Sequence, residues 1–271
     1  YPQNQWTLDD IVQAGGKLAR DTDSDGRVDC FGYIVRYDNV NAYPMLHLFG
    51  AEFFSRDGRG CLLRDADGIA CVRWAYDQVH THKIAPGYAQ VEEGALAMFR
   101  RGKVAMTRQT LREFAELRRA EGGQDFEAVL FPRHPTTNRV AAMSSTLAYG
   151  ISSTAPSAHD ALQWIKFMSS REIGVQMLLG GYSYPGCRLA SWQDARVVAL
   201  YPVCAQLGDV ADVAESERLP WNLRLAECMR VWDEQIVSLW HDEVTPEECV
   251  AHIAQKIDSI LSQPVATDNS Q

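Results

Sequence analysis

The chain contains 271 residues, of which 46% are apolar and 23% are charged, a composition typical of a soluble globular protein with a substantial core. Its formal net charge of −9 argues against nonspecific binding to nucleic acid or to anionic membranes, because both need a basic surface. No apolar run reaches the roughly 20 residues that cross a bilayer as a helix. The length allows one large domain or two of medium size.

The first part of the chain is predicted to contain helices separated by a strand. Thr7, followed by Asp10 three positions later, is typical of a helix N-terminus, and this helix is expected to run to about Arg20. The elements expected after it are a strand over residues 30–35 and helices over 44–50 and 67–82.

The middle of the chain continues this alternation. Gly102 is a natural C′ residue for a helix over about 91–101, because glycine accepts the left-handed backbone conformation that ends many helices. The elements expected next are strands over residues 103–107, 127–131 and 141–152, and a short amphipathic helix over 110–120.

The last part is predicted to be mostly helical. Ser157 is the expected N-cap of one helix, and Gly180-Gly181 ends the helix that follows it. Residues 245–248, Thr-Pro-Glu-Glu, combine a capping box with proline at the first helical position. The alternation of helices and short strands along the chain predicts an α/β layered fold. Residues 265–271 are expected to form a disordered tail.

Seven cysteines lie at wide, irregular spacings. An odd number without a C-x-x-C pair argues against a zinc ribbon or a thioredoxin-like redox motif. Cys61 and Cys71 are suitably spaced for a disulfide in an oxidising compartment, and buried free thiols are the alternative. The cysteines therefore do not indicate a compartment.

Residues 21–29 contain the densest group of carboxylates in the chain, at Asp21, Asp23, Asp25 and Asp29. Alternating aspartates around a glycine are typical of a calcium-binding loop. The twelfth position counted from Asp21 is Gly32, where an EF-hand loop has a bidentate glutamate. Two interpretations follow: a calcium site, or a turn whose side chains bond nearby backbone N–H groups.

No recognised enzyme motif occurs in the sequence. The patterns H-E-x-x-H and G-x-S-x-G, a Walker loop and G-x-G-x-x-G are all missing. His80 and His82 are close in sequence, but they lie at a predicted helix end, where a positive charge complements the helix dipole. The sequence therefore predicts a protein without catalytic activity.

Several segments, in this order, resemble the extracellular solute-binding proteins of carbohydrate-type ABC importers (family 1, maltose-binding-protein-like). Trp6-Thr7-Leu8-Asp9-Asp10 leads a helix toward the acidic loop, and Gly102-Lys103-Val104-Ala105-Met106 and Tyr149-Gly150-Ile151-Ser152 occur further along. The remaining matching segments are residues 23–33, 83–86, 97–101, 161–170, 180–185 and 245–248.

The resemblance implies a bilobal, type II periplasmic-binding-protein-like α/β fold, in which two lobes joined by hinge strands close on a ligand. It also implies that the opening βα units of lobe one, and a signal peptide or lipidated cysteine before them, lie upstream of this chain. The implied division is mainly lobe two over 1–138, a return segment into lobe one over 139–187, and C-terminal helices largely of lobe two over 188–264.

The resemblance further implies a sugar site that pairs aromatic faces with polar groups. Arg108 is suited to an acidic sugar or another carboxylate, with a scaffold salt bridge as the alternative. For the aromatic candidates, Tyr43, Tyr182 and Tyr184, the alternative to ligand binding is packing within the protein. Trp74 and Trp164 are expected in the core. The positions that match the family's ligand segments are Tyr43, His47, Arg108, Gln109, Ser144, Ser145, Thr146, Tyr182 and Tyr184.

This sequence departs from the family at two of those segments. Thr107-Arg108-Gln109 stands where members often have Gly-x-Trp, and Ser144-Ser145 stands where Gly-Gly often occurs. The leading hypothesis is nevertheless a monomeric, extracytoplasmic substrate-binding component without a cofactor, either periplasmic or anchored at the cell surface. It would capture a sugar or related polyol and deliver it to ABC permease subunits. The alternatives are a bilobal ligand-sensing or interaction module and a calcium-stabilised carbohydrate-active enzyme fragment.

Overall fold

A computed structural model describes residues 3, 5–36, 39–91, 93–119, 126–140, 148–182, 184–206 and 222–263. The contacts divide the chain into two compact units. Unit 1 comprises residues 1–4, 109–130 and 144–216, and unit 2 comprises residues 5–108, 131–143 and 217–271.

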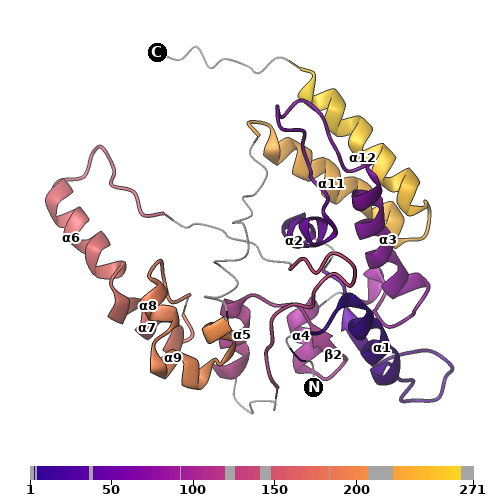
Figure 1. Cartoon of the computed structure of the whole chain (residues 1–271), viewed down its shortest axis with the longest axis horizontal. Helices are drawn as coiled ribbons and strands as arrows, with labels where there is room; N and C mark the ends of the chain where they lie inside the picture. Colours follow the sequence, from indigo (N-terminus) through magenta and orange to yellow (C-terminus); the bar gives the residue numbers. More distant parts are fainter. Residues whose placement is uncertain are drawn as a thin grey trace. The chain divides into compact units, whose positions relative to one another are not determined.

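Each unit is built mainly from helices, and Figure 1 labels them. Unit 2 contains α1 (Leu8–Leu18), β1 (Phe31–Ile34), α2 (Asn39–Phe49), α3 (Ala66–His80), the 3-10 turn η1 (Tyr88–Gln90), α4 (Ala95–Arg100), β2 (Val104–Thr107), α11 (Leu225–Trp240) and α12 (Pro246–Leu261). Unit 1 contains α5 (Leu111–Arg119), α6 (Ala158–Met168), α7 (Arg171–Leu179), α8 (Leu189–Trp192) and α9 (Ala195–Leu200).

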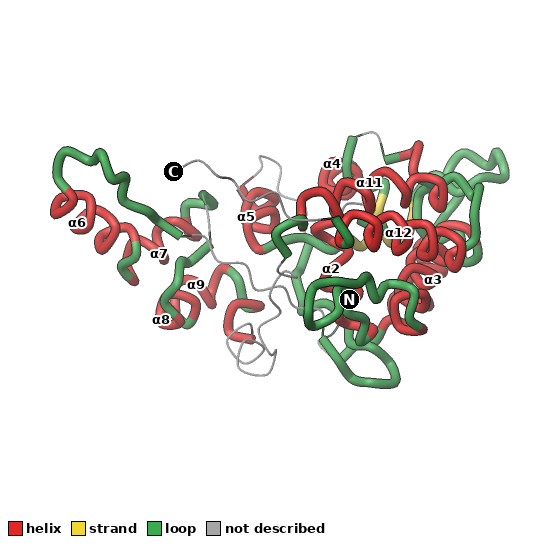
Figure 2. The backbone as a smooth tube through the Cα atoms, turned by 90° about the horizontal axis from the view of Figure 1, so that it is seen from above, coloured by secondary structure: helices red, strands yellow, loops and turns green. Residues whose placement is uncertain are grey.

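A pair of parallel strands forms the sheet of unit 2. β1 and β2 pair with Phe31 opposite Val104 and Ile34 opposite Thr107, which confirms both predicted strands. Every residue of β1 is buried, as expected for a strand that is covered on both faces. Figure 2 shows the two strands, in yellow, among the helices of this unit.

Helix α1 lies directly on the sheet because two glycines meet there. A Cβ atom on Gly32 would overlap the backbone carbonyl of Gly15 in α1, so this contact excludes any side chain at position 32. The helix begins at the predicted capping box, where the backbone N–H of Thr7 donates to the Asp10 carboxylate over 2.7 Å. The capping box thus sets the start of α1, and the glycine pair sets how closely it packs on β1.

The core of unit 2 is closed by α11 and α12, which pack against each other. Helix α12 begins at its predicted capping box, in which the Thr245 N–H donates to the Glu248 carboxylate over 2.9 Å. Val250, Ile253 and Ile257 are fully buried, as their i, i+3, i+7 spacing predicts for one helical face. Figure 1 shows α3 beside these two helices.

Unit 1 has a smaller core, centred on α7. Phe114 of α5 packs edge-on against Tyr201, with ring centroids 5.4 Å apart, and Val175 of α7 is fully buried in the same cluster. A Cβ atom on Gly174 would overlap the carbonyl oxygen of Pro185. The segment after α7 therefore folds back tightly onto that helix.

Helix α6 differs from the prediction for its tryptophan. Trp164 was expected in the core but is 60% exposed, and none of the residues of α6 is buried. The expectation for Trp164 is therefore wrong. Among the described elements α6 packs mainly against α7, so its apolar side chains have no layer to bury them. Trp74, in contrast, is half-buried against the core of unit 2.

Two predicted strands also differ from the structure. Residues 127–131 and 148–152 form no strand, because a strand needs a hydrogen-bonded neighbour and neither segment pairs with one among the described residues. Residues 141–147, the rest of the second predicted strand, lie outside the described residues.

The bounds of the two units do not follow those of the implied division everywhere. Residues 109–130 and 188–206 belong to unit 1, because α5, α8 and α9 pack against α7. The predicted tail at 265–271 lies outside the described residues. In the described part of the chain, no helix combines the length and apolarity that a membrane span requires.

Candidate functional site

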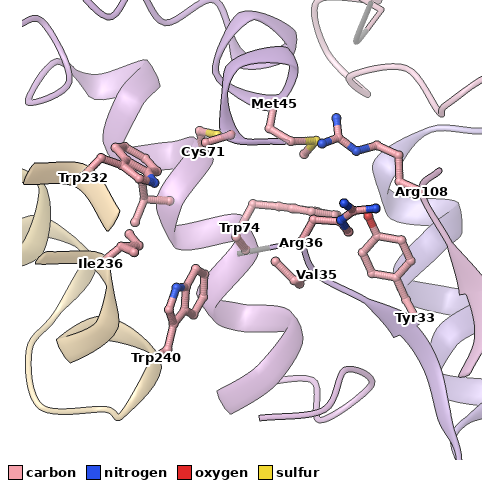
Figure 3. A pocket seen from close by; sticks show the side chains of 13 residues that line it. Tyr33, Val35, Arg36, Met45, Cys71, Trp74, Arg108, Trp232, Ile236 and Trp240 are labelled. Atoms are coloured by element: carbon pink, nitrogen blue, oxygen red, sulfur yellow. The ribbon is translucent and has the colours of Figure 1, made fainter. Parts of the chain in front are cut away.

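A pocket with a cavity of about 50 Å³ lies within unit 2. That volume has room for a few water molecules or for one polar group of a ligand. Figure 3 shows the pocket from close by, with the guanidinium groups on one side and the tryptophans of α11 on the other. It is lined by Tyr33, Val35, Arg36, Ala42, Met45, Cys71, Val72, Trp74, Ala75, Arg108, Trp232, Ile236 and Trp240.

The two cationic side chains of the pocket follow the two strands. Ile34 ends β1 opposite Thr107, which ends β2, so Arg36 and Arg108 both lie just beyond the carboxyl ends of a parallel pair. In open parallel sheets this edge is the usual place for a ligand. The topology therefore delivers both guanidinium groups to one pocket although 72 positions separate them in sequence.

Helix α11 supplies the opposite wall. Trp232, Ile236 and Trp240 are spaced i, i+4, i+8, which places all three on one helical face, and all three are buried. Trp232 also packs against Phe53 at a ring-centroid distance of 6.2 Å. The large rings are thus held by the core of unit 2 and line the pocket.

The titratable groups of the pocket stay protonated at neutral pH. Burial raises the pKa of the Tyr33 phenol to about 12, although the charges of Arg108 and Arg36 act to lower it. Burial also raises the pKa of the Cys71 thiol, with Arg108 again acting in the opposite direction. Tyr33 is therefore a hydroxyl donor, and Cys71 is a neutral thiol with little nucleophilic character.

At the pocket, the indole N–H groups of Trp74 and Trp232 are buried without a hydrogen-bond acceptor among the described residues. A buried donor without an acceptor is costly, by about 1–3 kcal/mol, and such groups are rare in folded proteins. Their position at a cavity means that a ligand or water oxygen there would satisfy them.

Arg108, one of the positions that the family resemblance suggested, lines this pocket. Its guanidinium also lies 5.6 Å from the centre of the Phe131 ring, so the aromatic face holds part of the side chain in place. Gln109 is half-buried and belongs to unit 1, and it does not line the pocket.

Tyr43 and His47 lie on α2 but do not line the pocket, which Ala42 and Met45 of the same helix do. The Tyr43 hydroxyl donates to the Met229 sulfur over 2.6 Å, and its ring packs 5.4 Å from Phe53. Burial raises the pKa of Tyr43. The carbonyl of His47 accepts from Arg139 over 3.4 Å. In this structure both residues pack within unit 2.

Tyr182 and Tyr184 belong to unit 1. The backbone N–H groups of Gly181 and Tyr182 donate to the carbonyls of Leu178 and Met177, which is the hydrogen-bond pattern of a Schellman motif at the end of α7. Gly181 has φ +65°, as that motif requires. Tyr182 is 66% exposed and its ring lies under the Arg119 guanidinium at 4.9 Å.

Tyr184 is half-buried. The remaining predicted ligand residues, Ser144, Ser145 and Thr146, lie outside the described residues.

The acidic loop is held by its own backbone. The carboxylates of Asp21, Asp23 and Asp25 lie within 4.8 Å of one another and are exposed. The Gly26 N–H donates to Asp21 over 2.8 Å, and this bond is the largest cause of the lowered pKa of Asp21. Asp29, the fourth predicted ligand, accepts instead from the N–H and hydroxyl of Thr22. The loop therefore forms a hydrogen-bonded turn.

Sequence reasoning missed most of the pocket. Arg36 follows β1 just as Arg108 follows β2. A prediction that the two strands pair in parallel would therefore have named both arginines as neighbours at one edge of the sheet. The i, i+4, i+8 spacing of the apolar residues on α11 was likewise available. Cys71 and Met45 carry no such signal, because a pocket-lining apolar residue looks like any other core residue.

Neither a protein-family model nor any curated protein matches this chain. Solved structures do match it. An ABC substrate-binding protein of Listeria monocytogenes in complex with cycloalternan is 14% identical, with a TM-score of 0.76 over 97% of this chain and 66% of that one. The maltose/maltodextrin-binding domain MalE of Bdellovibrio bacteriovorus, bound to maltotriose, is 17% identical, with a TM-score of 0.76 over 97% and 68%.

An ABC transporter solute-binding protein of Agrobacterium radiobacter in complex with ribitol is 14% identical, with a TM-score of 0.72 over 96% of this chain and 65% of that one. This chain thus spans about two thirds of the length of these structures. At such identities the likeness shows the fold: the chain has the α/β fold of type II periplasmic binding proteins, which confirms the predicted fold class.

Proposed function

We propose that this chain is the ligand-capturing part of an extracytoplasmic substrate-binding component of an ABC importer. The observation that carries the proposal is the fold, which is shared over nearly the whole chain with proteins bound to cycloalternan, maltotriose and ribitol. These ligands differ in size and share a dense array of hydroxyl groups. We therefore propose that the ligand is a sugar or a related polyol.

The pocket of unit 2 supports binding. Its cavity has room for one polar group of a ligand, and its polar hydrogens suit hydroxyl oxygens. Among the thirteen residues that line it there is no carboxylate and no imidazole, the groups that most often transfer protons in enzymes. The raised pKa values of Tyr33 and Cys71 also leave these two side chains neutral.

The proposed ligand residues are Arg108, Gln109, Tyr182 and Tyr184, with the serines at 144 and 145 and Thr146 as further hydroxyl ligands. Delivery to permease subunits, a monomeric state, and a periplasmic or surface-anchored location belong to the same proposal. No cofactor takes part in it.

The residue assignment is tested by Arg108→Ala and Tyr184→Ala in the protein made from the full reading frame that encodes this chain. Each change should lower affinity for the captured sugar by about 10-fold, the equivalent of one lost good polar or stacking contact. The melting temperature should change little. Calorimetric titration across a panel that includes maltotriose and ribitol measures the affinity.

Matched controls are Arg56→Ala, in an exposed turn of unit 2, and Tyr88→Ala, on η1; neither residue lines the pocket. Both controls should bind as the unchanged protein does. Unchanged binding in both the Arg108 and the Tyr184 variants would defeat the site assignment.

A further inference from the structure

We propose that the turn at residues 134–139 of unit 2 is an acid-sensitive switch. The turn is closed while the His134 imidazole is neutral, and it opens when that ring takes up a proton. The proposal concerns unit 2 alone and does not depend on the proposed ligand. It stands on the hydrogen bonds that close the turn and on the contacts that join the turn to two helices.

The His134 imidazole is a hydrogen-bond acceptor within the turn. The backbone N–H groups of Thr136 and Thr137 donate to its Nδ1 atom over 3.3 and 3.2 Å. A neutral imidazole has one acceptor nitrogen, whereas both nitrogens of an imidazolium carry a proton and act as donors. The two contacts therefore assign the Nε2–H tautomer to His134. Protonation of Nδ1 would remove the acceptor of both N–H groups at once.

The backbone of the turn depends on such contacts. The N–H of His134 donates to the carbonyl of Arg139, and the N–H of Asn138 donates to the carbonyl of His134, each over 3.0 Å. Asn138 has φ +57°, in the left-handed region that residues other than glycine adopt only where the surrounding contacts hold them. The acceptor on His134 is one of the contacts that hold this conformation.

The start of the turn is fixed on the segment that leads into α1. The N–H of Arg133 donates to the carbonyl of Trp6 over 2.8 Å, and the carbonyl of Arg133 accepts from the N–H of Leu8 over 3.0 Å. These bonds do not involve a titratable side chain. They should therefore keep the start of the turn in place in both states of the switch.

The rest of the turn contacts the C-terminal part of α2. The His134 ring packs edge-on against the Phe49 ring at a centroid distance of 4.9 Å. The Arg139 guanidinium donates to the carbonyl of His47 over 3.4 Å. Opening of the turn would therefore loosen its contact with α2 while Arg133 stays bound beside α1.

Two cations lie on the same segment as His134. The Arg133 guanidinium donates to the carbonyl of Asn138 over 3.1 Å, and Arg139 lies at the other end of the turn. Among the described residues, no carboxylate forms a hydrogen bond with the His134 ring. A proton on His134 would thus add a positive charge to a segment that already carries two.

The titratable groups on the neighbouring helices do not offset that charge by pairing with the ring. Helix α2 contributes His47, and α3 contributes Asp67, which lies with Arg139 around Gly50. Helix α1 contributes Asp10, whose carboxylate accepts from the N–H and the hydroxyl of Thr7. Repulsion by the arginines and loss of the acceptor therefore act in the same direction, toward an open turn in acid.

Nuclear magnetic resonance of this chain between about pH 7.5 and pH 5 tests the proposal, because histidine side chains change charge in that range. At neutral pH the ring nitrogen shifts should identify the Nε2–H tautomer of His134. The amide signals of Thr136 and Thr137 should move with the same midpoint as the ring of His134. Their hydrogen-exchange protection, corrected for the intrinsic effect of pH, should fall by about 5-fold, as expected when one net hydrogen bond is lost.

Two variants separate the role of His134 from a general effect of acid. His134→Asn keeps a side-chain oxygen that can accept the N–H two residues on but does not titrate, so Thr136 and Thr137 should stay protected throughout. His134→Ala has no acceptor and should show at neutral pH the low protection that the unchanged protein shows in acid. His252→Asn is the matched control, since His252 is exposed on α12, and it should leave the titration unchanged.

Three results would overturn the proposal. The first is an Nδ1–H tautomer of His134 at neutral pH, which is measured in the unchanged protein and needs no variant to fold. The second is a pair of amides at Thr136 and Thr137 that does not follow the titration of the His134 ring. The third is a pH dependence of these amides that persists in His134→Asn.

Discussion

The two units differ in what their helices pack against. In unit 2, α1 and α4 lie on a parallel strand pair, and α2, α3, α11 and α12 close one large core. In unit 1 the described residues form helices and loops but no strand, and Trp164 of α6 is 60% exposed. The comparison teaches that an apolar helical face is buried only where the same chain supplies a layer to cover it.

The difference also explains where the clearest site lies. A pocket needs walls that are fixed before the ligand arrives. The side chains around the unit 2 pocket come from the ends of both strands, from α2 and α3, and from α11. The apolar lining residues, among them Val35, Trp232 and Ile236, belong to the core of that unit, so packing fixes those walls.

The largest contrast should come from the same substitution in the two units. Leu239 of α11 is 0% exposed and Leu162 of α6 is 42% exposed. Leu239→Ala should lower the free energy of unfolding of unit 2 by about 2–5 kcal/mol, because it leaves a cavity. Leu162→Ala should change the stability of unit 1 by about 0.5 kcal/mol or less. Hydrogen exchange resolved by residue measures each unit separately.

An equal loss of unfolding free energy for the two leucine variants would show that α6 is buried in solution. That result would contradict the difference between the two units.

A second contrast uses glycines of the α1–β1 contact. Gly32→Ala should destabilise unit 2 by about 1–3 kcal/mol, because its Cβ would overlap the backbone of Gly15. Gly16 follows Gly15 in α1, and a Cβ atom there would meet nothing within 4 Å. Gly16→Ala should therefore stabilise unit 2 by about 0.5–1 kcal/mol. Urea denaturation followed by circular dichroism compares the two. A neutral Gly32→Ala would refute the direct packing of helix on sheet.

A smaller effect should appear when unit 1 is exposed to acid. Hydrogen bonds from Arg196 hold the pKa of Glu172 and of Asp194 at about 2, below their ordinary 4.5 and 3.8. The pKa values of both carboxyl groups are lower in the folded state than in the unfolded state. The stability that the two ionised carboxylates contribute is therefore present above about pH 5 and is lost as the pH falls toward 2. Hydrogen exchange of unit 1 at a series of pH values should show it.

Glu172→Gln together with Asp194→Asn should flatten that pH dependence. Glu116→Gln is the matched control, because Glu116 pairs with Arg112 of the same helix on the surface. An unchanged acid transition in the double variant would exclude the Arg196 cluster as its cause.

The smallest effect should be that of calcium on the acidic loop. Asp21 already accepts from the backbone N–H groups of Ser24 and Gly26, so the loop has its turn without a cation. At about 1 mM calcium, stabilisation should be about 0.4 kcal/mol or less, as for a dissociation constant of 1 mM or weaker. Thermal unfolding with calcium and with chelator measures it. A rise of several degrees that Asp23→Asn removes would make the loop a calcium site.

Local signals predicted much of the fold. The capping boxes at Thr7 and Thr245 and the helix end at Gly181 were readable from sequence because each depends on residues close to one another in the chain. Both strands of unit 2 were predicted as short apolar runs, although their pairing was not. Trp164 and residues 127–131 were not predicted correctly, since burial and strand formation depend on a partner elsewhere in the fold.

The site was harder to predict for the same reason. Arg108 was named because the segment after its strand matches a ligand segment of the family that the sequence resembles. Arg36 and Trp232 meet it through the pairing of β1 with β2 and the packing of α11, and local spacing alone does not show that these elements come together. Tyr43 looked like a cleft residue by its spacing from His47, but a helical face can turn to the core as well as to a cleft.

The central claim is that this protein captures a carbohydrate and does not transform it. Calorimetric titration of the protein from the full reading frame with maltotriose, ribitol and glucuronate, followed by chromatography of the recovered ligand, tests it most directly. The account predicts saturable binding of at least one of these ligands at one site, with the ligand recovered unchanged. Binding of none of them, or recovery of a cleaved product, would contradict it.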